Sequence, residues 1–198
     1  MNISLRRLIL KDDATLDDVR RVAAEDGWEE RQTIAADERQ PLQVIWLVPD
    51  RAASVHYVED TMVGLRYLMF RGYDTDDVRL HAGARIASYG VVETAALLRD
   101  PDPSERRRGV LVTCLSAPIA AETPYLPALV RAAEDPEPAV RHAVILGLGF
   151  VDWPETEPIL ERLATDDADP SVRDAAGGML AVKQQIRRSA APEQPSDA

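Results

Sequence analysis

Apolar residues in the second half of the chain recur three and four positions apart, which is the spacing of an amphipathic helix. Three such stripes follow one another: Val140, Ala143, Val144 and Gly147; Ile159, Leu160, Leu163 and Ala164; and Val172, Ala175, Ala176, Met179 and Ile186. Each stripe needs a neighbouring helix that covers it, because a lone helix would leave it in water. The pattern therefore predicts a stack of helices.

Prolines divide this region into helix pairs. Pro103, Pro138 and Pro170 each fall at or just before a first helical turn, where the missing N–H costs nothing. The predicted helices cover residues 75–88, 91–99, 104–116, 124–133, 139–148, 156–164 and 171–188.

The first 74 residues show a different pattern. Residues 15–31 have helical spacing and begin with Thr15 and Asp18, which fit a capping box. Residues 43–48 read QVIWLV, a β-branched and aromatic run that predicts a strand. This part of the chain is therefore predicted to be an α+β segment.

Residues 54–70 allow two interpretations. Segments 54–59 and 63–70 fit two further strands, which would complete a short antiparallel meander. The alternative is one amphipathic helix, in which the spaced residues are Val55, Val58, Met62, Leu65 and Met69. We favour the sheet, because Val, Tyr and Phe cluster here and Gly64 would interrupt a helix.

An aspartate stands six positions before an arginine three times in similar surroundings. The pairs are Asp100 with Arg106, Asp135 with Arg141, and Asp167 with Arg173. The three arginines are 35 and 32 positions apart, which is the period of a two-helix repeat. An earlier copy around Arg79 is imperfect, because the residue six positions before it is Tyr73.

With these motifs, residues 75–188 resemble HEAT-like repeats of the short type first noticed in phycobilisome lyases. The resemblance implies that the three aspartates and three arginines form a ladder that ties successive repeats together. It also implies a mostly α fold, an α-solenoid of about 3.5 helix pairs. Residues 1–74 would form a small N-terminal capping segment, and residues 189–198 a disordered tail.

The charge argues against a nucleic-acid partner. The formal net charge is −11; residues 1–74 carry 14 acidic and 10 basic side chains, and residues 75–198 carry 20 and 13. Such a field repels phosphate backbones, although a local basic groove would still permit binding.

No apolar run approaches the roughly 20 residues that span a bilayer, and the amino-terminal apolar stretch is too short for a secretory leader. We expect a cytoplasmic protein without a membrane segment.

Candidate chemistry is sparse. His56, His81 and His142 have no second histidine or cysteine at ligand spacing, and the single cysteine, Cys114, lies in an apolar run. Ser54, Ser88 and Ser116 have no neighbour in sequence that indicates an activated nucleophile. We therefore expect no catalytic residue, no metal site and no cofactor, which makes a non-enzymatic role the leading hypothesis.

The leading functional hypothesis is a protein-interaction scaffold. Stacked helix pairs expose a ridge made by their second helices, and such ridges bind proteins over an extended area. The candidate contact residues are Arg99, Arg131, Glu157 and Glu161, with Trp153 at the edge of the ridge. Trp153 lies in the loop FVDWPETEP, where its side chain either packs on its own helices or is offered to a partner.

Three alternatives stay open. The family resemblance alone suggests a lyase that acts on a tetrapyrrole or another bulky ligand. The acidic charge allows an inhibitor of a basic protein, and HEAT-like proteins with a basic groove bind nucleic acid. The sequence defines neither the identity of the partner nor the oligomeric state.

Overall fold

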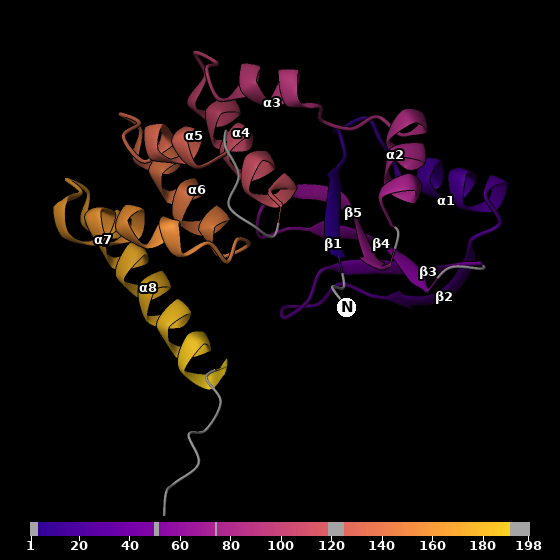
Figure 1. Cartoon of the computed structure of the whole chain (residues 1–198). Helices are drawn as coiled ribbons and strands as arrows, with labels where there is room; N and C mark the ends of the chain where they lie inside the picture. The colour runs from indigo at the N-terminus through magenta and orange to yellow at the C-terminus, as the bar shows by residue number, and fades with distance from the viewer. Residues whose placement is uncertain (1–3, 50–51, 74, 119–124, 191–198) are drawn as a thin grey trace, which may run out of the picture. The chain divides into compact units, whose positions relative to one another are not determined.

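The computed structural model describes residues 4–49, 52–73, 75–118 and 125–190, which are coloured in Figure 1. The chain forms two compact units. Unit 1 comprises Met1–Leu97 with Leu115–Ile119, and unit 2 comprises Leu98–Cys114 with Ala120–Ala198. Within the described ranges, no helix combines the length and the apolar composition that crossing a bilayer requires.

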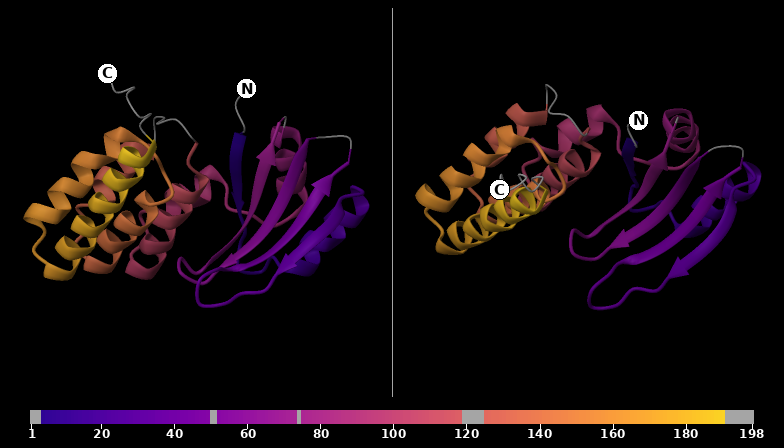
Figure 2. Two further views of the ribbon diagram at one scale, coloured as in Figure 1. Left: turned by 90° about the horizontal axis from the view of Figure 1, so that it is seen from below. Right: turned by 60° about the horizontal axis from the view of Figure 1, so that its bottom comes forward.

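Unit 1 is built on a five-stranded antiparallel sheet, whose strands lie side by side in Figure 2. The strands are β1 (Ser4–Ile9), β2 (Glu29–Ile34), β3 (Leu42–Val48), β4 (Ala53–Asp60) and β5 (Leu65–Gly72). Their order across the sheet is β1-β5-β4-β3-β2, so β2 to β5 form a meander and β1 pairs with its last strand.

The sheet interpretation of residues 54–70 is confirmed. The β4–β5 turn is closed by Asp60, whose Oδ1 accepts a hydrogen bond from the backbone N–H of Met62 at 3.0 Å. Gly64 in this turn has φ +68°, a left-handed conformation that glycine adopts at no steric cost. The residue that would have interrupted a helix therefore ends the turn of a hairpin.

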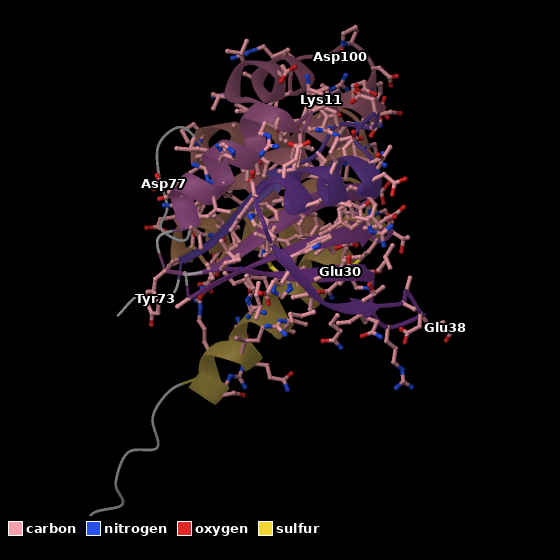
Figure 3. All side chains as sticks on the ribbon, turned by 90° about the vertical axis from the view of Figure 1, so that its right-hand side faces the viewer. Lys11, Glu30, Glu38, Tyr73, Asp77 and Asp100 are labelled. Atoms are coloured by element: carbon pink, nitrogen blue, oxygen red, sulfur yellow. The ribbon has the colours of Figure 1, made fainter. Side chains whose placement is uncertain are left out.

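The prediction missed the two edge strands, β1 and β2. Five of the six residues of β2 are exposed, so the strand lacks the alternation of buried and exposed positions that identifies a strand in a sequence. Charged side chains suit an edge strand, because they discourage pairing with another chain. Glu30 on β2 and Glu38 in the loop that follows are both exposed, and Glu38 lies at the outer edge of the molecule in Figure 3.

Helices α1 (Leu16–Glu25) and α2 (Thr75–Arg85) cover one face of this sheet. Alternate strand residues supply the covered face: Val55 pairs with Trp46 on one side and Phe70 on the other, and all three are at most 2% exposed. The core cluster contains these residues together with side chains from α1 and α2. Trp46 and Trp28 both belong to this core.

Helix α1 begins with the predicted capping box, in which Thr15 and Asp18 exchange hydrogen bonds between side chain and backbone. The helix ends at Glu25, six residues before the predicted end at 31, because Gly27 has φ +67° and β2 follows. Arg85 at the end of α2 donates a hydrogen bond to Asp26 Oδ1 at 2.5 Å, which joins the two helices.

Helix α2 was predicted as the first helix of the repeats, with the domain boundary at residue 74. In the structure α2 packs on β1 and β5, and its buried Val78 and Ala82 belong to the sheet core. The short α3 (Val91–Leu97) also falls in unit 1, so the boundary between the compact units follows Leu97.

Unit 2 is a helical repeat region. Its helices are α4 (Pro103–Ser116, of which the last two residues fall in unit 1), α5 (Tyr125–Ala132), α6 (Pro138–Leu148), the 3-10 turn η1 (Pro154–Thr156), α7 (Glu157–Asp166) and α8 (Pro170–Ala190). The five α-helices each lie within two residues of their predicted bounds, whereas η1 was not predicted. Three helices begin at the predicted prolines. The first two residues of the predicted tail are helical, and the others lie outside the described residues.

Glycine allows α4 and α6 to approach closely. A Cβ placed on Gly147 would lie 2.5 Å from Cys114 Sγ and 2.9 Å from its Cβ. Both distances are shorter than the van der Waals contact of such atoms, so only glycine fits at this position. The thiol beside it is fully enclosed, and burial raises the pKa of Cys114 to about 12.

We expect Gly147→Ala to lower the free energy of unfolding by about 1–3 kcal/mol, because the added methyl overpacks this contact. The control is Gly177→Ala in α8, where no described atom beyond the helix's own neighbouring backbone lies within 4 Å of the new Cβ. That variant should gain up to about 1 kcal/mol from helix propensity. Denaturant unfolding followed by circular dichroism measures both, and a Gly147→Ala variant as stable as the parent would contradict the packing argument.

Candidate functional site

The site is built on the aspartate–arginine pairs that connect helices of unit 2. The Nε and Nη2 atoms of Arg106 in α4 donate hydrogen bonds to the two carboxylate oxygens of Asp135 at 2.7 and 3.1 Å. Its Nη1 atom donates to the backbone carbonyls of Asp100 and Pro101 at 2.9 and 3.0 Å. One guanidinium therefore joins the start of its own repeat to the start of the next.

Arg141 in α6 repeats this arrangement. It donates to both carboxylate oxygens of Asp167 at 2.7 Å, and to the carbonyls of Asp135 and Pro136 at 2.8 and 3.1 Å. The pair is well covered, since the side chains of Arg141 and Asp167 are 11% and 3% exposed. A planar guanidinium that binds a carboxylate through two parallel hydrogen bonds fixes orientation as well as distance.

The two ends of this series differ from its middle. Arg173 donates to the carbonyls of Asp167 and Ala168 at 2.5 and 3.2 Å, but it pairs with no carboxylate among the described residues. Arg79, the imperfect copy, has an ion pair with Asp76 on its own helix at 3.6 Å. The bidentate contacts therefore join α4 to the start of α6 and α6 to the start of α8.

The contacts stabilise the charged forms of the aspartates. The hydrogen bonds from Arg141 hold the pKa of Asp167 below its usual range, although burial opposes them. For Asp135 burial alone would raise the pKa, but the hydrogen bonds from Arg106 and from the Glu137 backbone outweigh it and the pKa is lowered. Both carboxylates therefore stay ionised and paired at neutral pH.

The exposed side of the second helices carries charges of both signs. We define the α5–α7 surface as the outward side chains Val130, Arg131, Glu161, Arg162 and Thr165. Arg131 in the last turn of α5 and Glu161 in the middle of α7 are exposed, as predicted for partner contacts. Arg162 donates a hydrogen bond to Glu134, just after α5, at 2.7 Å.

Trp153 does not belong to an exposed edge. Its side chain is 1% exposed, and its ring meets Tyr125 of α5 edge-on, with centroids 6.2 Å apart. Thr156 Oγ1 also donates to the Trp153 carbonyl at 2.6 Å, which closes the turn of η1. The loop tryptophan is therefore packed on its own helices, and the prediction that it lies at the edge of a binding surface is wrong.

The other two predicted contact residues are less available than expected. Glu157 at the start of α7 is half-buried and forms an ion pair with Arg187 of α8. Arg99 is exposed, but it lies in the turn after α3 rather than on a second helix. The structure therefore brings Arg131 and Glu161 to the α5–α7 surface and places the other candidates elsewhere.

Two features of α8 were missed. Lys183 is only 8% exposed, and its Nζ donates to the carbonyl of Val151 at 2.6 Å, where burial lowers the pKa of the amine. Ile186, predicted on the buried stripe, is 62% exposed. A lysine stem can cover apolar surface as well as an aliphatic residue does, and hydropathy patterns do not register it.

In unit 1 a serine and a histidine make a contact of a type that can carry chemistry. Ser54 Oγ and His56 Nε2, two residues apart on the same side of β4, lie 3.0 Å apart. No activating neighbour was predicted for Ser54, although two polar residues two positions apart on a strand lie on the same face and could have indicated the contact. His56 is buried, and Nδ1 has no hydrogen-bond partner within the described part of the chain. The described residues also contain no group of three or more potential metal ligands.

The comparison with protein families agrees with the repeat geometry. Residues 92–181, from α3 to α8, match the family model of HEAT repeats, so this part of the chain consists of HEAT-like repeats. The match is to HEAT repeats in general and does not single out the phycobilisome-lyase type. The searches of curated proteins and of solved structures returned no match.

Acid titration should weaken unit 2 through these aspartates. Because the folded-state pKa of Asp167 is depressed, its contribution is present above the unfolded pKa of about 3.9 and is lost as the pH falls through the folded value. Asp167→Asn should therefore flatten the decline of stability below about pH 4. Asp166→Asn removes a neighbouring exposed carboxylate and serves as the control; equal acid sensitivity in both variants would contradict this assignment.

A second pH effect should arise from His56. Burial, with the nearby charge of Arg71, lowers its pKa, so protonation below the unfolded value of about 6.5 favours unfolding. Stability should fall as the pH decreases from about 6.5 toward the folded pKa, by at most about 1.4 kcal/mol per pH unit. In His56→Gln this slope should be smaller when unfolding is measured at pH 5 to 7 (about the range of histidine titration).

Proposed function

We propose that the chain is a non-enzymatic interaction module, in which the HEAT-like repeats form a short α-solenoid that binds a protein through the α5–α7 surface. The family match supports the proposal, because HEAT repeats are commonly protein-interaction modules. The observation that carries the proposal is the ladder geometry. It holds the first helices together and leaves the outward side of the second helices uncovered.

The chemistry of the α5–α7 surface suits a protein partner. Val130 is 38% exposed beside Arg131, and Glu161 and Arg162 lie on α7. An interface with apolar contact at its centre and charges of both signs at its rim is typical of protein–protein recognition. The acidic excess of the chain favours partners whose contact surface is basic.

Rigidity is the second argument for binding. Each bidentate pair fixes the register between consecutive repeats, so the exposed side chains are held by a preorganised frame. A preorganised surface loses less conformational entropy on association than a mobile one. The ladder therefore supports binding through the frame that it fixes, and its largely covered side chains are not part of the proposed contact surface.

The test is reversal of the two exposed charges. Arg131→Glu with Glu161→Lys keeps the net charge and should reduce the affinity for any partner captured by the parent chain at least about tenfold, because it creates like-charge contacts. Glu30→Lys with Arg31→Glu on β2 of unit 1 is the matched control. Affinities are measured by titration calorimetry with each partner identified after crosslinking, and circular dichroism verifies the fold.

Unchanged affinity of a correctly folded Arg131→Glu, Glu161→Lys variant would reject the α5–α7 surface. Equal loss in the β2 control would place the contact on unit 1 instead.

A further inference from the structure

Helix α8 is the last described helix of the repeat region. It has the same surface features through which the preceding repeats contact the next helix. In the two preceding repeats a small residue meets the next helix: Cys114 of α4 lies against Gly147, and a Cβ on Gly149 would lie 3.1 Å from Met179 of α8. The spacings of 35 and 32 residues that relate the ladder arginines also relate Cys114 and Gly149 to Ala181. Ala181 is exposed, so the equivalent surface of α8 is uncovered.

Two glycines leave the helix backbone open on this surface. Gly177 and Gly178 lie inside α8, and no described atom is within 4 Å of the place where either would carry a Cβ. Glycine is unfavourable inside a helix, and close packing against another backbone is its usual compensation. No compensation exists within the described chain at this position.

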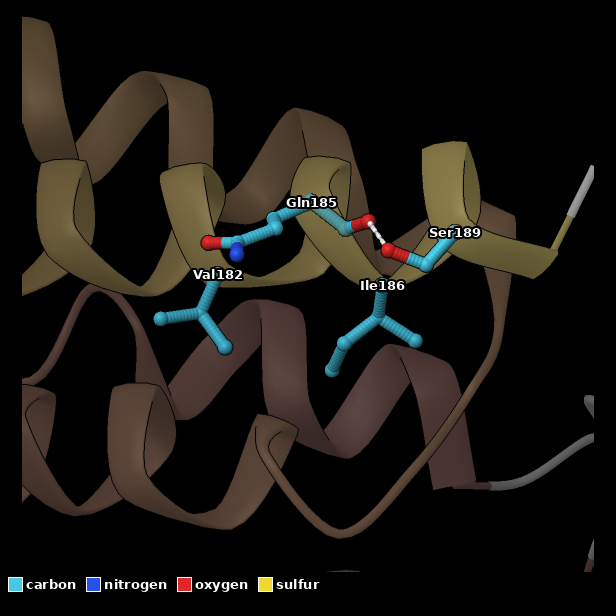
Figure 4. Close-up of a pocket in the computed structure, with 4 residues that line it drawn as sticks. All are labelled: Val182, Gln185, Ile186 and Ser189. Atoms are coloured by element: carbon cyan, nitrogen blue, oxygen red, sulfur yellow. Dashed lines mark hydrogen bonds between the residues drawn. The ribbon is translucent and has the colours of Figure 1, made fainter.

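Beside the glycines, α8 exposes two large apolar side chains. Val182 and Ile186 are 52% and 62% exposed, and with Gln185 and Ser189 they line a shallow hollow of about 440 Å³. Figure 4 shows Val182 and Ile186 pointing to the same side of the helix, one turn apart. Apolar side chains next to an open backbone form a knob beside a hole.

Opposite charges lie near the two ends of α8, so that two antiparallel copies of the helix could pair them. Asp174 is exposed near the start of the helix, and Arg188 is exposed near its end. Gly178 and Ile186 lie four residues before and four residues after Val182. An antiparallel copy of α8 centred near Val182 would therefore bring Ile186 over Gly178 and Arg188 within reach of Asp174, twice by symmetry.

We propose that α8 is the dimerisation surface of the protein and that its occupant is α8 of a second copy, packed antiparallel. The interface is isologous: Ile186 of each copy fills the space above Gly178 of the other, and Asp174 pairs with Arg188 across the two-fold axis. Charge complementarity selects the second copy, because one helix supplies both partners of each pair. This surface is distinct from the α5–α7 surface, which stays available for binding a different protein.

Sedimentation equilibrium of the full chain tests the proposal. The parent should show a concentration-dependent monomer–dimer equilibrium, whereas Ile186→Glu and Gly178→Leu should each raise the dimer dissociation constant at least about tenfold. Gly178→Leu adds a good helix former where no described atom outside the neighbouring backbone of α8 lies within 4 Å of the new Cβ, and circular dichroism verifies its fold. Glu161→Lys, on the α5–α7 surface, should leave the equilibrium unchanged.

Charge reversal separates this interface from a general apolar contact. Asp174→Arg and Arg188→Asp should each weaken the dimer, and the double variant should recover it, because the pair is restored in the opposite sense. A parent that stays monomeric at every concentration, or a dimer indifferent to Ile186→Glu, would overturn the proposal. Binding at the α5–α7 surface is measured separately, so failure of the dimer leaves the proposed function intact.

Discussion

Unit 2 depends on two arginine side chains, each of which donates hydrogen bonds to two successive repeats at once. Arg106 and Arg141 use one edge of the guanidinium for the carboxylate of the following repeat and the remaining nitrogen for two carbonyls of their own loop. The planar donor set allows this only in one orientation, so the distance and the register between first helices are set together. Within that register, Gly147 of α6 lies in close contact with Cys114 of α4.

This arrangement separates structural chemistry from the exposed surface. The Cys114 thiol and Trp153 are buried, and the paired side chains of Asp135 and Asp167 are only 10% and 3% exposed. What the repeats present to solvent is a mixed-charge side on α5 and α7 and an apolar, glycine-containing side on α8. A HEAT-like region of this kind supports two binding proposals, one for a different protein and one for a second copy.

The repeat region was predicted well from the sequence, because the patterns that define its helices and its ladder lie within short stretches of the chain. Helices bounded by proline and aspartates six residues before an arginine are patterns within one repeat, and they identify the ladder residues and helix limits closely. The edge strand β2 could not be predicted in this way, because an exposed strand lacks alternation. The assignment of α2 to the sheet, the burial of Trp153 and the exposure of Ile186 depend on long-range packing, which periodicity does not encode.

The most direct test of the central claim is a double-mutant cycle on Arg141 and Asp167, with free energies of unfolding measured for the parent, Arg141→Ala, Asp167→Asn and the double variant. The account predicts a coupling energy of about 2 kcal/mol, below that of a fully buried pair because Arg141 retains some exposure. Additive losses, with no coupling between the two substitutions, would contradict the claim that this contact joins the repeats.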